Sequence, residues 1–254
     1  MDLLEVYKFV VEAARQGGDV NKAVEFLNLA LEAEEPLKSQ ILEEALNLAM
    51  RAVDEARWSM LYNTIIIITA IVFLVLALYN YKKILGFFFI KIYSKRRVIK
   101  GSGKPKTLLF DRDVAAVVSA FLVVASVILV GQLVKPIEPY MALGLLGPDE
   151  EIGNYPDFVE PGAPISLNVY VYNHMGRPVW LRITARYLDN ITVEPSPHGF
   201  YVRELFLAHD KSVIIPLNFH VNKTGVLKVE LWLYEVDGTL IYTNRSTYLM
   251  IRVK

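Results

Sequence analysis

The residues of this sequence best suited to chemistry are its four histidines, which are His174, His198, His209 and His220. No two of them have the i, i+4 spacing of a helical zinc site, and none lies beside a glutamate in a zinc-protease pattern. His174 falls in an expected turn and His198 follows a proline in a loop, which indicates solvated or turn-stabilising side chains. We therefore predict that the chain binds no metal ion.

His209 and Asp210 are adjacent between two expected strands, where the aspartate favours a turn. A carboxylate beside an imidazole can orient a general base, yet no serine of the sequence lies in a nucleophile-elbow pattern. Because the chain has no cysteine, thiol catalysis, cysteine-based zinc sites and disulfide bonds are excluded. We predict no catalytic residue, no cofactor and no stand-alone enzyme activity; a hydrolase that uses His209 and Asp210 is the minor alternative.

Two further segments partly resemble ligand sites. The segment 101–105, GSGKP, lacks the spacing of a phosphate-binding loop and ends in a proline where that loop would start a helix. Acidic residues gather between positions 149 and 160, where carboxylates could surround Ca²⁺, but the ligand spacing of an EF-hand loop is absent. We interpret the first segment as a flexible linker and the second as a solvated loop. The acidic residues are Asp149, Glu150, Glu151, Asp157 and Glu160.

Three Asn-x-Ser/Thr triplets follow residue 135 and none precedes it; their asparagines are Asn190, Asn222 and Asn244. Such a triplet is the acceptor for an N-linked glycan on an exposed external surface. A single triplet arises easily by chance, so the clustering in one part of the chain carries the weight. We predict that at least one of the three is glycosylated.

The elements that must position these residues include two long uncharged stretches, at 59–81 and 114–134. At about 1.5 Å per helical residue, each is long enough to cross the ~30 Å hydrocarbon core of a bilayer. Trp58, Tyr62 and Tyr79 bracket the first stretch, as aromatic residues do at membrane interfaces. We predict two transmembrane helices. Small side chains suited to close helix packing lie in the second one, at Ala116, Ser119 and Ala120.

The charged residues are distributed unevenly, although the totals of 27 basic and 27 acidic residues balance. Residues 1–58 carry 6 basic and 12 acidic side chains, whereas residues 81–113 carry 10 basic and 2 acidic ones. Short basic loops stay in the cytoplasm. We therefore predict a cytoplasmic loop at 82–113, a cell-membrane location and both termini outside the cell.

The start of that loop is apolar as well as basic. The segment 84–90, ILGFFFI, is too short to cross a membrane and is expected to lie along its inner surface. The basic cluster after it would contact anionic lipid headgroups, or it simply flanks the first span as a stop-transfer signal. We therefore expect membrane lipids among the partners. The interfacial basic cluster consists of Lys91, Lys95, Arg96 and Arg97.

The segment before the first span is predicted to form an α-helical hairpin or bundle outside the membrane. Apolar residues recur at helical spacing in 3–16, 20–34 and 37–57. Asp19 can cap the second helix and Pro36 can start the third, and no helix breaker separates the third helix from the span. We expect this small platform to lean on the C-terminal domain or on another subunit.

The pattern changes at residue 165 from helical spacing to the alternation of β-strands, after a membrane-proximal linker at 135–164. Roughly seven short strands in a domain of this size are typical of an immunoglobulin-like sandwich. We predict an extracytoplasmic antiparallel β-sandwich over 165–254, and hence a membrane protein of mixed α and β class. The expected strands are 165–171, 179–187, 199–208, 211–220, 225–235 and 239–252.

Short motifs lie just before the first expected strand and in the turn that follows it. They are Leu146-Gly147-Pro148, Asn154-Tyr155-Pro156 and Tyr172-Asn173-His174-x-Gly176. This combination resembles a family of archaeal membrane proteins of unknown function, in which an external β domain follows the last span. The resemblance covers 143–254 and implies an archaeal origin and an external sandwich, with no catalytic residue to carry over. The helices and two spans of this chain differ from the multi-span N-terminal half of that family.

Two hypotheses for the function stay open at this point. In the first, the chain is a non-catalytic, membrane-anchored interaction module of the cell envelope that binds another envelope protein or a glycan. In the second, it is an accessory subunit of a larger membrane complex, such as secretion or protein-glycosylation machinery. Both hypotheses predict another membrane or envelope protein as a partner, and neither involves nucleic acid.

Overall fold

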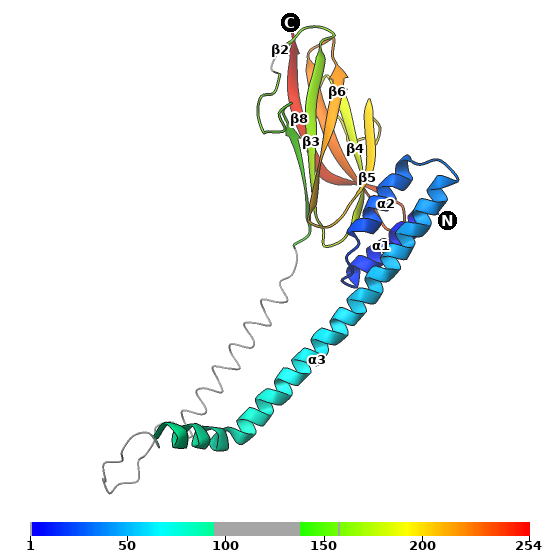
Figure 1. Ribbon diagram of the computed structural model, residues 1–254. Coiled ribbons are helices and arrows are strands. Elements are labelled where there is room, and N and C mark those ends of the chain that lie inside the picture. Colours follow the sequence, from blue (N-terminus) through cyan, green and yellow to red (C-terminus); the bar gives the residue numbers. More distant parts are fainter. Residues whose placement is uncertain (1, 94–137, 157) are drawn as a thin grey trace. The chain divides into compact units, whose positions relative to one another are not determined.

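The computed structural model describes residues 2–93, 138–156 and 158–254, and the chain divides into two compact units (Figure 1). One unit combines Met1–Ser59 with Ile137–Lys254, and the other is Met60–Pro136. The first unit contains two short helices, the beginning of a third helix and the described strands. Every site considered below lies in this first unit.

Three helices precede the strands in the described residues, namely α1 (Leu3–Arg15), α2 (Asn21–Glu32) and α3 (Leu37–Tyr93). Helix α1 begins after Asp2, whose carboxylate accepts a hydrogen bond from the Leu4 N–H. Asp19 accepts a hydrogen bond from the Asn21 N–H in the same way at the start of α2. These short-range bonds explain why the helices start within a residue of the positions that the sequence predicts.

The helices pack around a second apolar core, to which Phe206 and Ala208 also belong. Its fully buried members include Tyr7 of α1, Leu27 of α2 and Leu42 of α3. Gly18, in the connection between α1 and α2, lies so close to α3 that an added Cβ would stand 2.8 Å from the Ala52 carbonyl oxygen. Glycine has no Cβ and therefore permits this approach of two backbones.

The long helix α3 corrects the predicted membrane fold. As the absence of a helix breaker indicates, the third helix continues through 59–81 and ends only at Tyr93. In the part of the chain that the structure describes, no helix is long and apolar enough to cross a membrane. The predicted two-span membrane fold and the predicted cell-membrane location with both termini outside are therefore wrong. The prediction relied on the length of the uncharged stretch and on the aromatic residues that bracket it, whereas this stretch is an interior part of a longer helix with charged residues on either side. The second expected span, 114–134, lies outside the described residues.

The side chains of α3 are exposed and mostly apolar where the helix leaves the first unit. Trp58 is 73% exposed, and the four isoleucines at 65–68 are between 47% and 61% exposed. Neither of the apolar cores found among the described residues includes them.

The C-terminal part of the chain forms a β-sandwich of two sheets (Figure 1). The three-stranded sheet has the order β1-β3-β6, and the five-stranded sheet has the order β2-β8-β7-β4-β5. Neighbouring strands are antiparallel except β2 and β8, which pair in parallel. The predicted sandwich is present, and it gains β1 and β2 from the stretch that was expected to be a linker. The strands are β1 (Tyr140–Leu146), β2 (Phe158–Val159), β3 (Pro164–His174), β4 (Val179–Leu188), β5 (Tyr201–Leu207), β6 (Lys211–His220), β7 (Gly225–Tyr234) and β8 (Leu240–Val253).

Alternating side chains of the two sheets form the core between them. Leu167, Val169 and Val171 of β3 are fully buried and belong to one apolar cluster with Leu181 and Ile183 of β4. This spacing of two residues is the pattern that the sequence shows, because every second side chain of a strand points to the same face. Each sheet ends at an edge strand, and two of these edges, β5 and β6, follow each other in the chain.

The helices pack against the outer face of the five-stranded sheet. The Tyr7 ring centroid lies 5.3 Å from that of Phe206 and 6.0 Å from that of Trp180. Clusters of aromatic rings bury a large apolar area in a defined geometry. This cluster fixes α1 and α2 beside β5, the edge strand that carries Phe206 (Figure 1).

Candidate functional site

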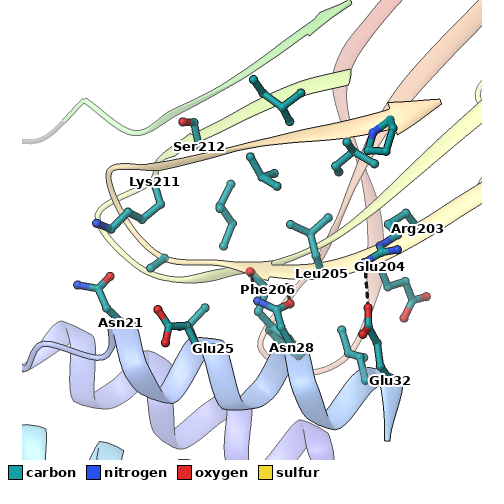
Figure 2. Close-up of a pocket in the computed structure, with 18 of the residues that line it drawn as sticks. Asn21, Glu25, Asn28, Glu32, Arg203, Glu204, Leu205, Phe206, Lys211 and Ser212 are labelled. Atoms are coloured by element: carbon teal, nitrogen blue, oxygen red, sulfur yellow. Dashed lines mark hydrogen bonds and ion pairs between the residues drawn. The ribbon is translucent and has the colours of Figure 1, made fainter. Parts of the chain in front are cut away.

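A groove of ≈930 Å³ runs along one side of the sandwich, between helix α2 and the edge strands β5 and β6 (Figure 2). Helix α2 lines it with polar side chains that include Glu25 and Asn28, and the strands line it with apolar side chains such as Leu205 and Ile215. A groove that is bounded by strand edges offers both main-chain and apolar contacts to an extended ligand. The hydrogen bonds at the β5 edge determine which main-chain groups are available to such a ligand.

The carboxamide of Asn28 pairs with the main chain of Phe206 at the edge of β5 (Figure 2). Its Nδ2 donates to the Phe206 carbonyl oxygen at 2.8 Å, and the Phe206 N–H donates to its Oδ1 at 2.7 Å. A neighbouring strand would make this same pair of bonds with an outward-facing residue. The helix holds Asn28 in place because Leu27 and Ala30 are fully buried in the helical core. Asn28 thus occupies one position of the β5 edge.

The bonds of Asn28 show which main-chain groups of β5 face away from β4. Phe206 stands opposite Trp180 in the register, and its N–H and C=O both point outward to Asn28. Because successive residues of an antiparallel strand alternate in this respect, the N–H and C=O groups of Val202 and Glu204 also point outward. Among the described residues, no strand or side chain bonds to these groups. The β5 edge is therefore open on the N-terminal side of Phe206, the residue to which Asn28 bonds.

The neighbouring edge strand, β6, is less suited to pairing. Pro216 lies in its middle, opposite Asn168 of β3. A proline has no N–H to offer to a new strand, which is why prolines occur at protected sheet edges. Ile214 and Ile215 of the same strand line the groove. We conclude that β6 provides an apolar wall and that β5 provides the hydrogen-bonding edge.

Two ion pairs lie at the end of the groove that is remote from the β5–β6 turn, and Figure 2 shows one of them, between Arg203 and Glu32. Arg203 Nη2 lies 2.9 Å from Glu32 Oε1, and both side chains are more than half exposed, so this pair contributes little to stability. Glu204 binds Arg182 and accepts a hydrogen bond from the Tyr234 hydroxyl at 2.8 Å. Burial, together with the hydrogen bond to Glu204, raises the pKa of Tyr234 to about 12.

A second group of charges lies beneath the connection from β4 to β5. Glu230 is fully buried, and its Oε1 is 2.8 Å from Arg186 Nη2 and 3.0 Å from Lys228 Nζ. The Ser196 N–H donates to the other Glu230 oxygen at 3.0 Å, and Lys228 donates to the Val193 carbonyl oxygen at 2.9 Å. These bonds hold the connection against the outer face of the sheet, so this group has a structural role.

A cluster of two histidines, an aspartate and a tyrosine lies where β3 ends and the β5–β6 turn begins. His174 Nδ1 is 2.5 Å from Asp210 Oδ1, and the Tyr172 hydroxyl donates to the same oxygen at 2.9 Å. His209 Nε2 lies 3.5 Å from Asp210 Oδ2. The hydrogen bond from His174, followed by that from Tyr172, lowers the pKa of Asp210, and the bond to Asp210 raises the pKa of Tyr172 to about 12. Asp210 therefore pairs more closely with the distant His174 than with its sequence neighbour His209.

Asn173, which is fully buried, holds the two loops of this cluster together. Its Nδ2 donates to the carbonyl oxygens of Arg177 at 2.9 Å and Leu207 at 2.8 Å. Its Oδ1 accepts a hydrogen bond from the Met175 N–H at 2.9 Å, and its carbonyl oxygen accepts one from the Asp210 N–H at 2.8 Å. Through these hydrogen bonds, the Asn-His-x-Gly motif connects the end of β3 to the β5–β6 turn.

The other residues that the sequence singled out do not join either site. Asn190, Asn222 and Asn244 are all exposed, as glycan acceptors must be, and their use stays a prediction. In the acidic segment, Asp149 accepts a hydrogen bond from Asn154 Nδ2 at 2.6 Å, so this carboxylate stabilises its own loop. Asp149, Glu150, Glu151 and Glu160 are described, and Asp157 is not.

Most of the predicted interfacial and helix-packing residues lie beyond the part of the chain that the structure describes. Lys91 belongs to α3, and the other members lie outside the described residues. The prediction of membrane lipids as partners depended on the two-span fold. Because that fold is wrong, this prediction has no remaining support. The members outside the described residues are Lys95, Arg96, Arg97, Ala116, Ser119 and Ala120.

Sequence reasoning missed Asn28, although this residue defines the groove. An asparagine inside a helix is an unfavourable choice on intrinsic propensity. That mismatch between the residue and its helix is the one local signal that a special contact exists. The partner of the contact, Phe206, is 178 positions away and has no local signal.

No family model matches the sequence, and no curated protein matches it. A chain from the complex of zinc 2-glycoprotein and prolactin-inducible protein of human seminal plasma is 12% identical, with a TM-score of 0.32 over 45% of this chain and 93% of that chain. The CARDB domain of a Pyrococcus furiosus protein is 15% identical, with a TM-score of 0.31 over 46% of this chain and 89% of that chain. A β-glucosidase of Listeria innocua is 10% identical, with a TM-score of 0.29 over 46% of this chain and 16% of that enzyme. Values this low transfer neither a family nor an activity, so the resemblance to an archaeal family stays a prediction.

Proposed function

We propose that this chain is a non-catalytic interaction module that binds an extended segment of a partner protein along the open edge of β5. The observation that carries the proposal is the open main-chain edge of β5 at Val202 and Glu204, of which Glu204 lines a groove of ≈930 Å³. A segment that enters the groove would add one strand to the five-stranded sheet, which is a common mode of peptide recognition.

The receptor side of this interaction is already formed. Strand β5 pairs with β4 from Tyr201 to Leu207, and Leu205 and Leu207 are buried in the sandwich core. A rigid edge loses little conformational entropy on binding, which favours affinity. Asn28 sets the limit of the added strand, because it already bonds to Phe206.

The walls of the groove define the kind of segment that fits. Alternate side chains of an added strand point to the same side. One set would face the apolar side chains that line the groove, among them Leu205 and Ile215. The other set would face solvent beside the exposed Arg203–Glu32 pair. The proposed ligand is therefore an extended segment in which apolar and polar residues alternate.

The proposal of a non-catalytic role is supported by the composition of the histidine cluster. In the described part of the chain, His174 bonds to Tyr172 and Asp210, and neither of these is a nucleophile for acyl transfer. Strand addition also suits the alternative role of an accessory subunit, because the partner segment can belong to a larger complex.

A matched pair of substitutions at Val202 tests the proposal. Val202→Pro removes the outward N–H and leaves the ladder to β4 intact, whereas Val202→Thr keeps the N–H and the strand-forming β-branched shape. The probe is a synthetic library of end-blocked peptides of about six residues, the usual strand length, with alternating apolar and polar positions. Binding is measured by fluorescence anisotropy.

We expect peptides that bind the wild-type chain to lose about tenfold in affinity with Val202→Pro, the equivalent of one hydrogen bond, and to keep it with Val202→Thr. Circular dichroism checks that both variants are folded. A library without any binder, or equal binding by the two variants, would contradict strand addition at β5.

A further inference from the structure

We propose that His174, His209 and Asp210 bind one divalent transition-metal ion, of which Zn²⁺ is the representative. Each residue offers one ligand atom, and these atoms all lie within 4.8 Å of one another. The residues come from the end of β3 and from the turn between β5 and β6. None of the three residues lines the proposed peptide groove, so the test of the metal site is independent of the test of strand addition at β5.

The distances suit a metal ion with few changes. Zinc ligands lie about 2.0–2.2 Å from the ion, which places neighbouring ligand atoms of a tetrahedral site about 3.3 Å apart. His209 Nε2 and Asp210 Oδ2 are already 3.5 Å apart. His174 Nδ1 and Asp210 Oδ1 lie 2.5 Å apart. An ion between them requires the two atoms to separate and the His174 proton to move from Nδ1 to Nε2.

The ligand-bearing loops are held in position by bonds that a metal ion would not disturb. Asp210 has a φ of 57°, and its N–H donates to the Asn173 carbonyl oxygen at 2.8 Å. The buried Asn173 side chain also binds the Leu207 carbonyl oxygen at 2.8 Å, so it links the two loops. The Tyr172 hydroxyl donates to Asp210 and orients the carboxylate, as groups around metal ligands commonly do.

The ligand types select the metal. Two imidazole nitrogens and one carboxylate oxygen suit Zn²⁺, Co²⁺ or Ni²⁺, whereas Ca²⁺ and Mg²⁺ prefer sets of oxygen ligands. The histidine side chains are about a quarter to a third exposed, at 28% for His174 and 29% for His209, so an ion has access. Three protein ligands leave a position of a tetrahedral ion for water or a further ligand.

Binding also requires a proton to move on His209. The Gly176 N–H donates to His209 Nδ1 at 3.2 Å, which places the proton of the neutral ring on Nε2. Coordination through Nε2 moves this proton to Nδ1 and ends the bond to Gly176. The free energy lost with one long hydrogen bond is small compared with the free energy of metal binding.

Zinc titration of the full chain tests the site. The metal-free protein is prepared with a chelator, and Zn²⁺ binding is measured by isothermal titration calorimetry at neutral pH. Asp210→Asn keeps the size of the side chain and the tolerance for positive φ, but removes the charge. His174→Gln removes the second ligand, and the exposed His198 and His220 supply the controls His198→Gln and His220→Gln.

We expect one Zn²⁺ per wild-type chain, an affinity about tenfold lower or weaker still in Asp210→Asn and His174→Gln, and no change in the two controls. No saturable binding by the wild-type chain, or equal losses in the controls, would overturn the site. Should Asp210→Asn or His174→Gln fail to fold, side-chain NMR of the wild-type chain decides. Zn²⁺ must then shift the imidazole resonances of His174 and His209, and a shift of His198 or His220 in their place overturns the proposal.

Discussion

The substitution Asn28→Ala tests how firmly helix α2 is attached to the β5 edge. The change removes both hydrogen bonds to Phe206, whose lengths are 2.8 and 2.7 Å, and leaves the buried helix residues unaltered. Phe206 is only 1% exposed, so water does not readily replace the lost partner. We therefore expect a measurable loss of stability from a single exchange of a polar side chain.

The magnitude follows from two opposing terms. Two hydrogen bonds contribute about 2 kcal/mol together, taking about 1 kcal/mol for each. Alanine is a better helix former than asparagine, which raises the free energy of unfolding by roughly 0.6 kcal/mol. The free energy of unfolding should thus fall by about 1.4 kcal/mol, which corresponds to a decrease of about 3–6 °C in Tm for a unit of this size.

Thermal and urea unfolding, followed by circular dichroism, measure this effect. Glu25→Ala is the matched control, because Glu25 lines the same groove on the same helix and makes no ion pair or hydrogen bond in the described part of the chain. We expect the control to change the free energy of unfolding by less than about 0.5 kcal/mol. If Asn28→Ala loses no more stability than Glu25→Ala, then the amide does not hold α2 to β5 and the reasoning about the edge is refuted.

Three further predictions concern the packing of the first unit. Glu230→Ala leaves two buried cations without their carboxylate and should lower the free energy of unfolding by about 3–5 kcal/mol, measured from urea unfolding; a loss below 1 kcal/mol would contradict it. The pKa of Tyr234 is raised to about 12 in the folded chain, so its stabilising contribution is complete below pH ~10 and is lost as the pH rises through about 12. Tyr234→Phe should lack this part of the loss, and its tyrosinate absorbance titration should show a smaller component near pH 12, where Tyr172 still titrates; identical titrations of the two proteins would oppose this. Gly18→Ala places a Cβ 2.8 Å from the Ala52 carbonyl oxygen and should lower stability by about 1–3 kcal/mol in thermal unfolding, whereas an unchanged Tm would show that the helices separate freely.

Much of the sandwich is predictable from the sequence because its strands alternate apolar and polar residues. The expected strands 211–220 and 225–235 coincide closely with β6 and β7. Strand β1 was placed in a linker because its sequence, YMALGLL, is an apolar run without alternation. The periodicity of such a run does not distinguish a buried strand from a buried helix segment. Here the run forms a strand that pairs with β3.

The membrane prediction failed for a different physical reason. Hydropathy measures the apolar content of a segment, but it does not describe the helix that contains the segment. Helix α3 begins at Leu37 in the helical core, passes through 59–81 and continues to Tyr93. The predicted orientation of the chain and its predicted extracytoplasmic location were derived from the two spans, so these predictions are wrong as well.

The two candidate sites were the least predictable features because each depends on long-range contacts. Asn28 and Phe206 are 178 positions apart, and His174 and Asp210 are 36 positions apart. The sequence does indicate a turn at each member of the second pair. It contains no information on which turns meet at the same end of a sandwich, since that depends on the order of the strands in the sheets.

Hydrogen exchange at individual amides of β5 tests strand addition most directly. The measurement compares the full chain with and without a saturating peptide, by NMR or by mass spectrometry with fragmentation at single residues. The N–H groups of Val202 and Glu204 should exchange much more slowly with the peptide bound, whereas those of Arg203 and Leu205 are protected in both states because they face β4. A saturated complex in which Val202 and Glu204 exchange as fast as in the free chain would contradict the proposed function.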